Sequence, residues 1–212
     1  MRMGIRLLAA GTAGAAYVLG SHWLMTAAPA SAWNAVAVVG PMLLFAAFVA
    51  WQRRRRVLAL AAAAATGALA VQAWHGGGAL APQAIYLGQH VTIHLLLAFV
   101  FGLTLQAGRE PLVTALARRV HGRLTPAMVV YSRKVTIAWA IYFVTMAALS
   151  LALFALAPFA AWATFANLVT PLAIVAMFVG EYLLRYRLHP EFERATLTQA
   201  MRAYADRSAR HE

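Results

Sequence analysis

Long apolar stretches separated by short polar segments run along most of the chain. Six stretches are long enough to cross a bilayer, because a helix needs about 20 apolar residues to span about 30 Å of hydrocarbon. None of them alternates apolar and polar residues with a period of two, so a lipid-facing β-barrel is not predicted. The predicted spans cover residues 5–25, 33–51, 57–74, 85–105, 135–157 and 163–184. We therefore expect an all-α, polytopic helical bundle with a single transmembrane domain over residues 1–184.

The composition strengthens this prediction. Of the 212 residues, 63% are hydrophobic and 11% are charged, whereas soluble domains average about 45–50% apolar and about 25% charged residues. The chain contains no cysteine, which excludes disulfides, thiol catalysis and thiolate metal sites.

The basic residues predict the orientation of the spans. There are 18 Lys and Arg against six Asp and Glu, a net charge of +12. Every basic group falls on the same predicted side, and the opposite loops, around residues 26–32, 75–84 and 158–162, carry no charge. By the positive-inside rule, both termini are expected to be cytoplasmic. Nucleic-acid binding is not expected, because no basic domain with interleaved aromatic residues is present. The basic groups are Arg2 and Arg6; Arg53, Arg54, Arg55 and Arg56; Arg109, Arg118, Arg119, Arg123, Arg133 and Lys134; and Arg185, Arg187, Arg194, Arg202, Arg207 and Arg210.

Two similar hexapeptides lie in the uncharged loops, APASAW at residues 28–33 and APFAAW at residues 157–162. Each precedes an apolar run with a proline, Pro41 or Pro171, eight or nine residues after the tryptophan. This pattern predicts a parallel repeat of two helical hairpins, spans 1–2 and spans 5–6. Chance similarity in an alanine-rich chain is the alternative. The segment Ala30-Ser31-Ala32 also fits a signal-peptide cleavage site, which would remove residues 1–32, but the apolar run before it exceeds the usual 7–15 residues.

The connection over residues 106–134 predicts a short helix at the cytoplasmic membrane surface. Pro111 suits its first position and Gly122 its end. An apolar face would lie in the interface with arginines toward lipid phosphates, and a solvated linker is the alternative. The apolar face consists of Leu112, Val113, Leu116 and Val120. Thr125 and Pro126 would begin the next helix, and residues 185–212 form a polar cytoplasmic tail.

Tryptophans mark both ends of the predicted spans. Trp23, Trp33, Trp74 and Trp162 lie near the uncharged side, and Trp51 lies near the charged side. Indole rings favour the headgroup boundary, so we interpret them as an aromatic belt rather than as ligand-stacking groups.

Polar residues inside spans are costly and therefore indicate candidate sites. His90 and His94 are one helical turn apart, and His22 and His75 are expected at a similar depth. Imidazole ligates metals and haem iron, so a haem or metal site is one hypothesis. A proton relay and structural hydrogen bonding are the alternatives.

Glu181 is the only acidic residue within a predicted span. Its spacing to Arg185 predicts an ion pair at the cytoplasmic end of the last span. A small proton-coupled transporter that uses Glu181 is the alternative interpretation. The chain has no Ser-His-Asp set, glycine-rich phosphate loop or paired intramembrane carboxylates, so an enzyme is not favoured.

The segments GREPL, YSRKVTIAWAIYF and LFALAPFAAWATFANLVTPLAIVAMFVGEYLLRYR carry a resemblance over about residues 85–190. They resemble a family of uncharacterised bacterial inner-membrane proteins, often encoded beside genes for aryl-polyene, xanthomonadin-type or other acyl-lipid biosynthesis. The resemblance implies a role in assembling such lipids, and it assigns no catalytic residue. The matching positions are Gly108, Arg109, Glu110, Pro111, Tyr131, Arg133, Thr136, Trp139, Asn167, Glu181, Tyr182 and Arg185.

The leading hypothesis is therefore a non-enzymatic inner-membrane accessory protein that helps to assemble, hold or move an acyl- or polyene-lipid product. Anionic headgroups on the cytoplasmic side, and proteins of a lipid-biosynthesis pathway, are the expected partners. No cofactor is predicted beyond the haem or metal hypothesis. The expected lipid- or partner-binding residues are Arg53, Arg54, Arg55, Arg56, Arg109, Arg118, Arg119, Arg133 and Lys134.

Overall fold

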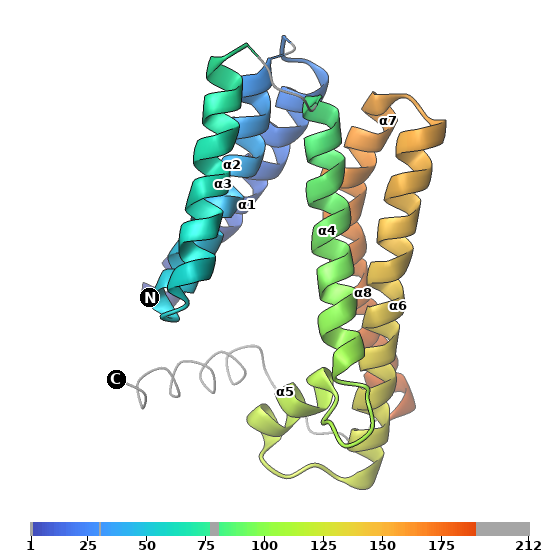
Figure 1. Cartoon of the computed structure of the whole chain (residues 1–212). Coiled ribbons are helices and arrows are strands. Elements are labelled where there is room, and N and C mark those ends of the chain that lie inside the picture. Colours follow the sequence, from blue (N-terminus) through green and yellow to red (C-terminus); the bar gives the residue numbers. More distant parts are fainter. Residues whose placement is uncertain (1, 30, 77–80, 190–212) are drawn as a thin grey trace. The chain divides into compact units, whose positions relative to one another are not determined.

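A computed structural model describes residues 2–29, 31–76 and 81–189, and all regular structure in these residues is helical (Figure 1). The segment from Phe159 to Leu188 is one continuous helix with three labelled parts, so seven helices are present in the described ranges. The predicted tail beyond residue 189 lies outside them. The elements are α1 (Arg2–Thr26), α2 (Ala32–Gln52), α3 (Arg56–Trp74), α4 (Pro82–Leu103), α5 (Leu112–His121), α6 (Pro126–Leu156), α7 (Phe159–Thr164), η1 (Phe165–Val169) and α8 (Thr170–Leu188).

Five helices are long and apolar enough to cross a membrane: α2, α3, α4, α6 and the continuous helix Phe159–Leu188. Large apolar side chains on them face outward; Phe45 and Phe48 of α2 are 68% and 60% exposed. Such a surface is typical of lipid contact rather than of a soluble monomer. The all-α, multi-pass prediction is confirmed at this level. The first predicted span, residues 5–25, is helical within α1 but is not among the five, so the count of six stays a prediction.

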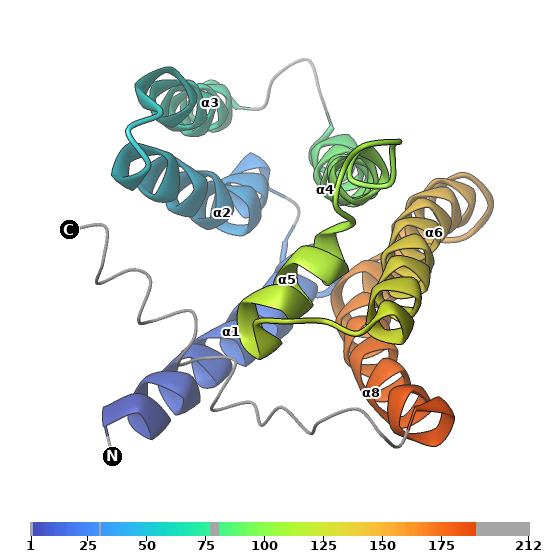
Figure 2. The same cartoon turned by 90° about the horizontal axis from the view of Figure 1, so that it is seen from below.

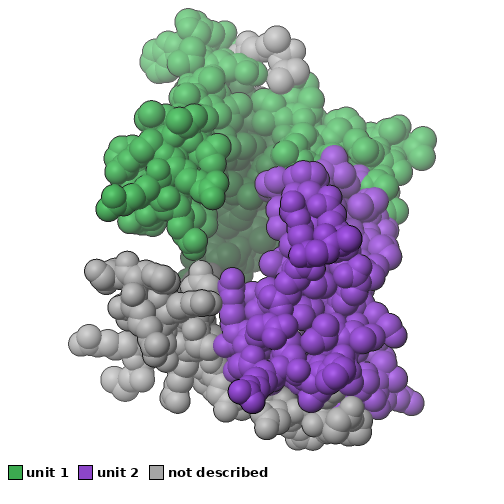
Figure 3. Space-filling view, turned by 60° about the horizontal axis from the view of Figure 1, so that its bottom comes forward, with its two compact units in different colours: residues 1–92, 148–172 green, residues 93–147, 173–212 purple. Residues whose placement is uncertain are grey.

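The chain divides into two compact units, which are coloured separately in Figure 3. Unit 1 comprises residues 1–92 and 148–172, and unit 2 comprises residues 93–147 and 173–212. Each unit has its own apolar core and is described by itself. The predicted single domain over residues 1–184 stays a prediction.

In unit 1, a side-chain amide holds the turn between α1 and α2, and small residues let α2 pack closely against α3. The Asn34 side-chain amide donates hydrogen bonds to the carbonyls of Leu24 (3.2 Å) and Pro29 (3.0 Å), which holds the turn between α1 and α2. Ala59 and Ala73 of α3 are buried, as is Gly40 of α2. Because these side chains are small, the α2 and α3 backbones approach closely.

Trp162 lies at the centre of the unit 1 core. It is fully buried, its indole N–H donates to the Ser150 hydroxyl at 3.0 Å, and its ring packs against Phe154 and Phe159. The prediction that Trp162 belongs to the aromatic belt is therefore wrong. Trp23, Trp33, Trp51 and Trp74 are exposed, by 47% to 78%.

Trp162 and Trp33 differ in burial because the helix starts at a different position in each hexapeptide. The first hexapeptide begins α2 at Ala32 after the Ser31 cap, so Trp33 is the second helical residue. The second begins α7 at Phe159 directly after Pro158, so Trp162 is the fourth. Two positions correspond to a rotation of about 200° around a helix. The two tryptophans therefore face in different directions.

A π-helical turn, η1, precedes Pro171. The Thr170 backbone N–H donates to the carbonyl of Phe165, five residues earlier. A proline inside a regular helix clashes with the carbonyl four residues before it. The wider turn relieves this crowding, so the helix continues past Pro171 into α8.

The core of unit 2 is aromatic. Val135, Trp139 and Phe143 of α6 are buried and pack against the second half of α4 and against α8. The ring of Trp139 lies 4.7–6.3 Å from those of Phe101, Tyr142, Phe143 and Phe178. Such aromatic contacts add about 0.5–1.5 kcal/mol each beyond area burial.

Hydroxyl groups from neighbouring segments hold α5, which follows α4 and precedes α6 in the chain (Figure 2). Pro111 stands one position before the helix and offers no side-chain cap. Instead, the Leu112 N–H donates to Thr104 Oγ1 at 3.0 Å and the Val113 N–H to Thr136 Oγ1 at 3.2 Å. These bonds satisfy amides that a helix start leaves without partners.

The predicted helix end at Gly122 and the predicted start of the next helix at Thr125 are confirmed, whereas Pro111 precedes α5 instead of occupying its first position. Gly122 follows α5 with φ 73, a left-handed conformation that glycine adopts at little cost. The Thr125 hydroxyl accepts from the Met128 N–H at 3.3 Å at the start of α6. The most buried residue of α5 is Thr114, whereas Leu116 is 47% exposed, so part of the predicted apolar face does not pack on the protein. Its contact with lipid stays a prediction.

Replacing Thr136 with valine is expected to loosen α5. Thr136 is fully buried and its hydroxyl also donates to the Ser132 carbonyl at 2.9 Å. Valine leaves the Val113 N–H without its partner, which costs about 1–3 kcal/mol. Limited trypsin digestion should then cut at Arg118 and Arg119 roughly tenfold faster. Thr145→Val, at an exposed position of the same helix, is the control; equal rates for both variants would contradict the assigned role.

Candidate functional site

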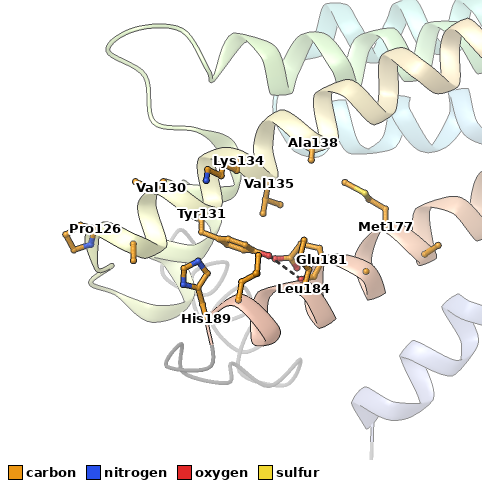
Figure 4. A pocket seen from close by; sticks show the side chains of 14 residues that line it. Pro126, Val130, Tyr131, Lys134, Val135, Ala138, Met177, Glu181, Leu184 and His189 are labelled. Atoms are coloured by element: carbon orange, nitrogen blue, oxygen red, sulfur yellow. Dashed lines mark hydrogen bonds between the residues drawn. The ribbon is translucent and has the colours of Figure 1, made fainter.

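A groove of about 880 Å³ lies between the first half of α6 and the second half of α8, entirely within unit 2 (Figure 4). Its wall is predominantly apolar, with a few polar groups. The volume falls within the range of about 300–1,000 Å³ that is usual for small-molecule sites. The lining residues are Pro126, Ala127, Val130, Tyr131, Lys134, Val135, Ala138, Ala176, Met177, Gly180, Glu181, Leu184, Leu188 and His189.

Small residues on the facing helices create this groove. Ala127 and Ala138 of α6 and Ala176 and Gly180 of α8 contribute little or no side chain to the lining. A Cβ atom built at Gly180 would meet no heavy atom within 4 Å, so the space beside it is open. Larger residues at these positions would fill the gap between the helices.

One end of the groove is polar. The Tyr131 hydroxyl donates to the Glu181 backbone carbonyl at 3.3 Å, which connects α6 to α8. The ring of His189 meets the Tyr131 ring edge-on, with centroids 5.3 Å apart. The other end, near Ala138, Ala176 and Met177, contains no charged lining residue.

Charged side chains lie at this polar end of the groove. Glu181 and Arg185 form the ion pair that their spacing predicts, with Oε2 and Nη2 2.6 Å apart and side chains 16% and 29% exposed. The Arg185 Nε atom is buried and has no hydrogen-bond partner. Lys134 lines the groove from the facing helix. The lining of this end therefore has one cation and one carboxylate, and the carboxylate is paired with Arg185.

The other predicted basic residues lie elsewhere. Arg53 to Arg56 are exposed in the turn between α2 and α3 of unit 1, where Arg54 has φ 57 and the Arg56 guanidinium lies 3.6 Å from the Trp51 ring centroid. In unit 2, Arg109 and Arg119 are exposed. Arg118 pairs with Glu110 at 2.7 Å on the surface, and Arg133 donates to the Leu105 carbonyl at 3.1 Å. Of the nine predicted binding residues, Lys134 is the one that lines the groove.

The histidines have mostly aromatic and hydroxyl neighbours. In unit 1, His90 Nε2 lies 3.2 Å from Thr170 Oγ1, and its ring is near Trp162 and Phe165. In unit 2, His94 is buried with its ring 6.1 Å from that of Phe143. His75 is exposed and His22 is partly buried.

No group of three His, Cys, Asp or Glu residues that could hold a metal occurs within residues 2–29, 31–76 and 81–189. The haem or metal site at His90 and His94 stays a prediction, as does the proton-coupled role of Glu181.

Sequence analysis identified Lys134, Glu181 and Arg185 but missed the groove. Tyr131, Met177, Gly180, Leu184 and His189 were not proposed as lining residues. The available signal was the series Ala176, Gly180 and Leu184 at helical spacing, beside the single intramembrane acid.

The spanning helices and their exposed apolar surfaces define a multi-pass membrane protein with an interhelical groove. No protein-family model, curated protein or solved structure matches the chain. The resemblance to the inner-membrane family therefore stays a prediction.

Proposed function

We propose that this protein is an accessory protein of the bacterial inner membrane that holds an acyl-chain lipid in the groove between α6 and α8. The observation that carries the proposal is the distribution of polarity along the groove. Its apolar end is lined by Ala138, Ala176 and Met177, and its polar end by Lys134 and Glu181. An acyl chain with a polar head has the same division along its length.

The length of α6 supports a groove that opens at headgroup depth. Its 31 residues extend about 46 Å at 1.5 Å per residue, against about 30 Å of hydrocarbon. The surplus favours a polar first section, where Arg133 and Lys134 lie. In the proposed topology of six crossings with cytoplasmic termini, this section is cytoplasmic.

The holding role fits the assembly or movement of an acyl- or polyene-lipid product, the setting that the family resemblance implies. A groove that is open along the bilayer lets a lipid enter sideways from the leaflet. Proteins that make or receive the lipid would then be the partners, and the exposed arginines of the α2–α3 turn would face anionic headgroups.

A photoactivatable fatty acid tests this function. We expect adducts concentrated in residues 126–138 and 176–189 when the probe is added to membranes that contain the protein, because the groove holds a chain longer than passing lipids do. Peptide mass spectrometry would locate the adducts. The exposed apolar surfaces of α2 and α3 serve as the internal reference, and equal labelling there would contradict a binding groove.

A further inference from the structure

We infer that the groove selects a lipid with an anionic head, a carboxylate or phosphate, and that Glu181 is a built-in competitor for the position of that anion. The inference rests on the proposed function and names the class of lipid that the groove takes. Three observations on Arg185, Glu181 and Lys134 carry it.

Arg185 uses only half of one hydrogen-bonding edge. On a guanidinium, Nε–H and one Nη–H point in the same direction and together match the two oxygens of a carboxylate or phosphate. Here Nη2 binds Glu181, while Nε is buried without a partner. A buried donor without an acceptor is unusual in a native structure. An oxyanion that replaces Glu181 would engage both donors.

Arg185 borders the groove because of its place on α8. Glu181, Leu184, Leu188 and His189 all line the groove, and they stand four before, one before, three after and four after Arg185. The side chain therefore projects along the margin of the lined face. Its present partner, Glu181, belongs to the lining itself.

Lys134 supplies the second cation from across the groove. It lies one turn beyond Val130 and Tyr131 on the lined face of α6. Lys134 and Arg185 against Glu181 leave one positive charge at this end. A head with one negative charge restores neutrality, whereas a zwitterionic head does not. When the head binds, the Glu181 carboxylate must leave Arg185, so the acid weakens binding.

Titrations of the purified full chain in detergent, followed by native mass spectrometry, test this inference. The probes are dioleoyl phosphatidate, dioleoyl phosphatidylcholine with the same chains, and inorganic phosphate. We expect the phosphatidate to bind roughly fivefold more tightly than phosphatidylcholine, as a partly exposed charge contact permits. Lys134→Gln should remove most of this preference. Arg187→Gln, at an exposed position of α8 outside the groove, should keep it.

The direction of the change in phosphatidate affinity in Glu181→Gln tests the competitor role. Removal of the competing charge should tighten phosphatidate binding roughly three- to fivefold and leave phosphatidylcholine unchanged. Glutamine preserves the shape of the side chain, so folding is maintained. Unchanged or weaker phosphatidate binding would show that the ion pair is only structural and would overturn the competitor role.

The remaining outcomes separate this inference from the proposed function. If both lipids bind equally, head selection is overturned while lipid holding stands. If neither lipid binds, the proposed function itself fails. If inorganic phosphate displaces phosphatidate at equal concentration, the site recognises a free anion and not a lipid head, which also overturns the inference.

Discussion

Gly180→Leu is expected to lower acyl-chain labelling of the groove by about tenfold or more, a loss of at least about 1.4 kcal/mol of binding free energy. The leucine side chain would occupy the open space beside Gly180 and so exclude the methylene groups of a bound chain. Folding should not suffer, because leucine has a higher helix propensity than glycine by nearly 1 kcal/mol. The photoactivatable fatty acid and thermal unfolding in detergent would measure the two effects.

Gly88→Leu is the matched control. Gly88 is an exposed residue of α4, and its Cβ position is also open, but it does not line the groove. This variant should label like the native protein. Undiminished labelling of residues 126–138 and 176–189 in Gly180→Leu would rule out the groove as the acyl-chain site.

Trp162→Ala should lower the free energy of unfolding by about 2–4 kcal/mol. Soluble cores lose about 3–5 kcal/mol for such a truncation, and a bilayer lowers the value because lipid is nearly as apolar as the core. The packing loss remains, since Trp162 is fully buried against Phe154 and Phe159. Unfolding by sodium dodecyl sulfate in mixed micelles would give the change.

A double-mutant cycle with Ser150 separates packing from hydrogen bonding at this site. Ser150→Ala alone leaves the buried indole N–H without its acceptor, at about 1–3 kcal/mol. In the Trp162→Phe background the same change should cost much less. Equal costs in both backgrounds would show that the Trp162–Ser150 bond at 3.0 Å contributes nothing to stability. The control for Trp162→Ala is Trp33→Ala, at an exposed position.

The helices could be predicted from the sequence because length and polarity determine them. The predicted span 85–105 corresponds to α4 at Pro82–Leu103, and the predicted starts and ends around Gly122 and Thr125 agree with the structure. These features depend on neighbours within a few residues. The same locality explains the ion pair of Glu181 and Arg185, which are one turn apart.

Features that depend on distant residues could not be predicted in this way. An exposed indole at a membrane boundary and a buried one have similar flanking residues, so Trp162 resembled Trp33 until the helix starts were known. The groove requires the lateral pairing of α6 with α8, which no sequence period reports. The π-turn before Pro171 is a local feature and still could not be predicted, because hydropathy does not report the hydrogen-bond register of a helix.

Arg54 adopts a left-handed backbone conformation in the α2–α3 turn, so the positive charge at this position is accompanied by backbone strain. A residue with a side chain pays about 1–2 kcal/mol for this geometry, and glycine is the usual choice after a helix. Selection of variants for thermal stability alone would therefore favour glycine at position 54 and remove one of the four consecutive arginines from Arg53 to Arg56. A thermostabilised version of this protein should be checked for its orientation in the membrane, which basic residues in such turns determine, before its behaviour is taken to represent the native chain.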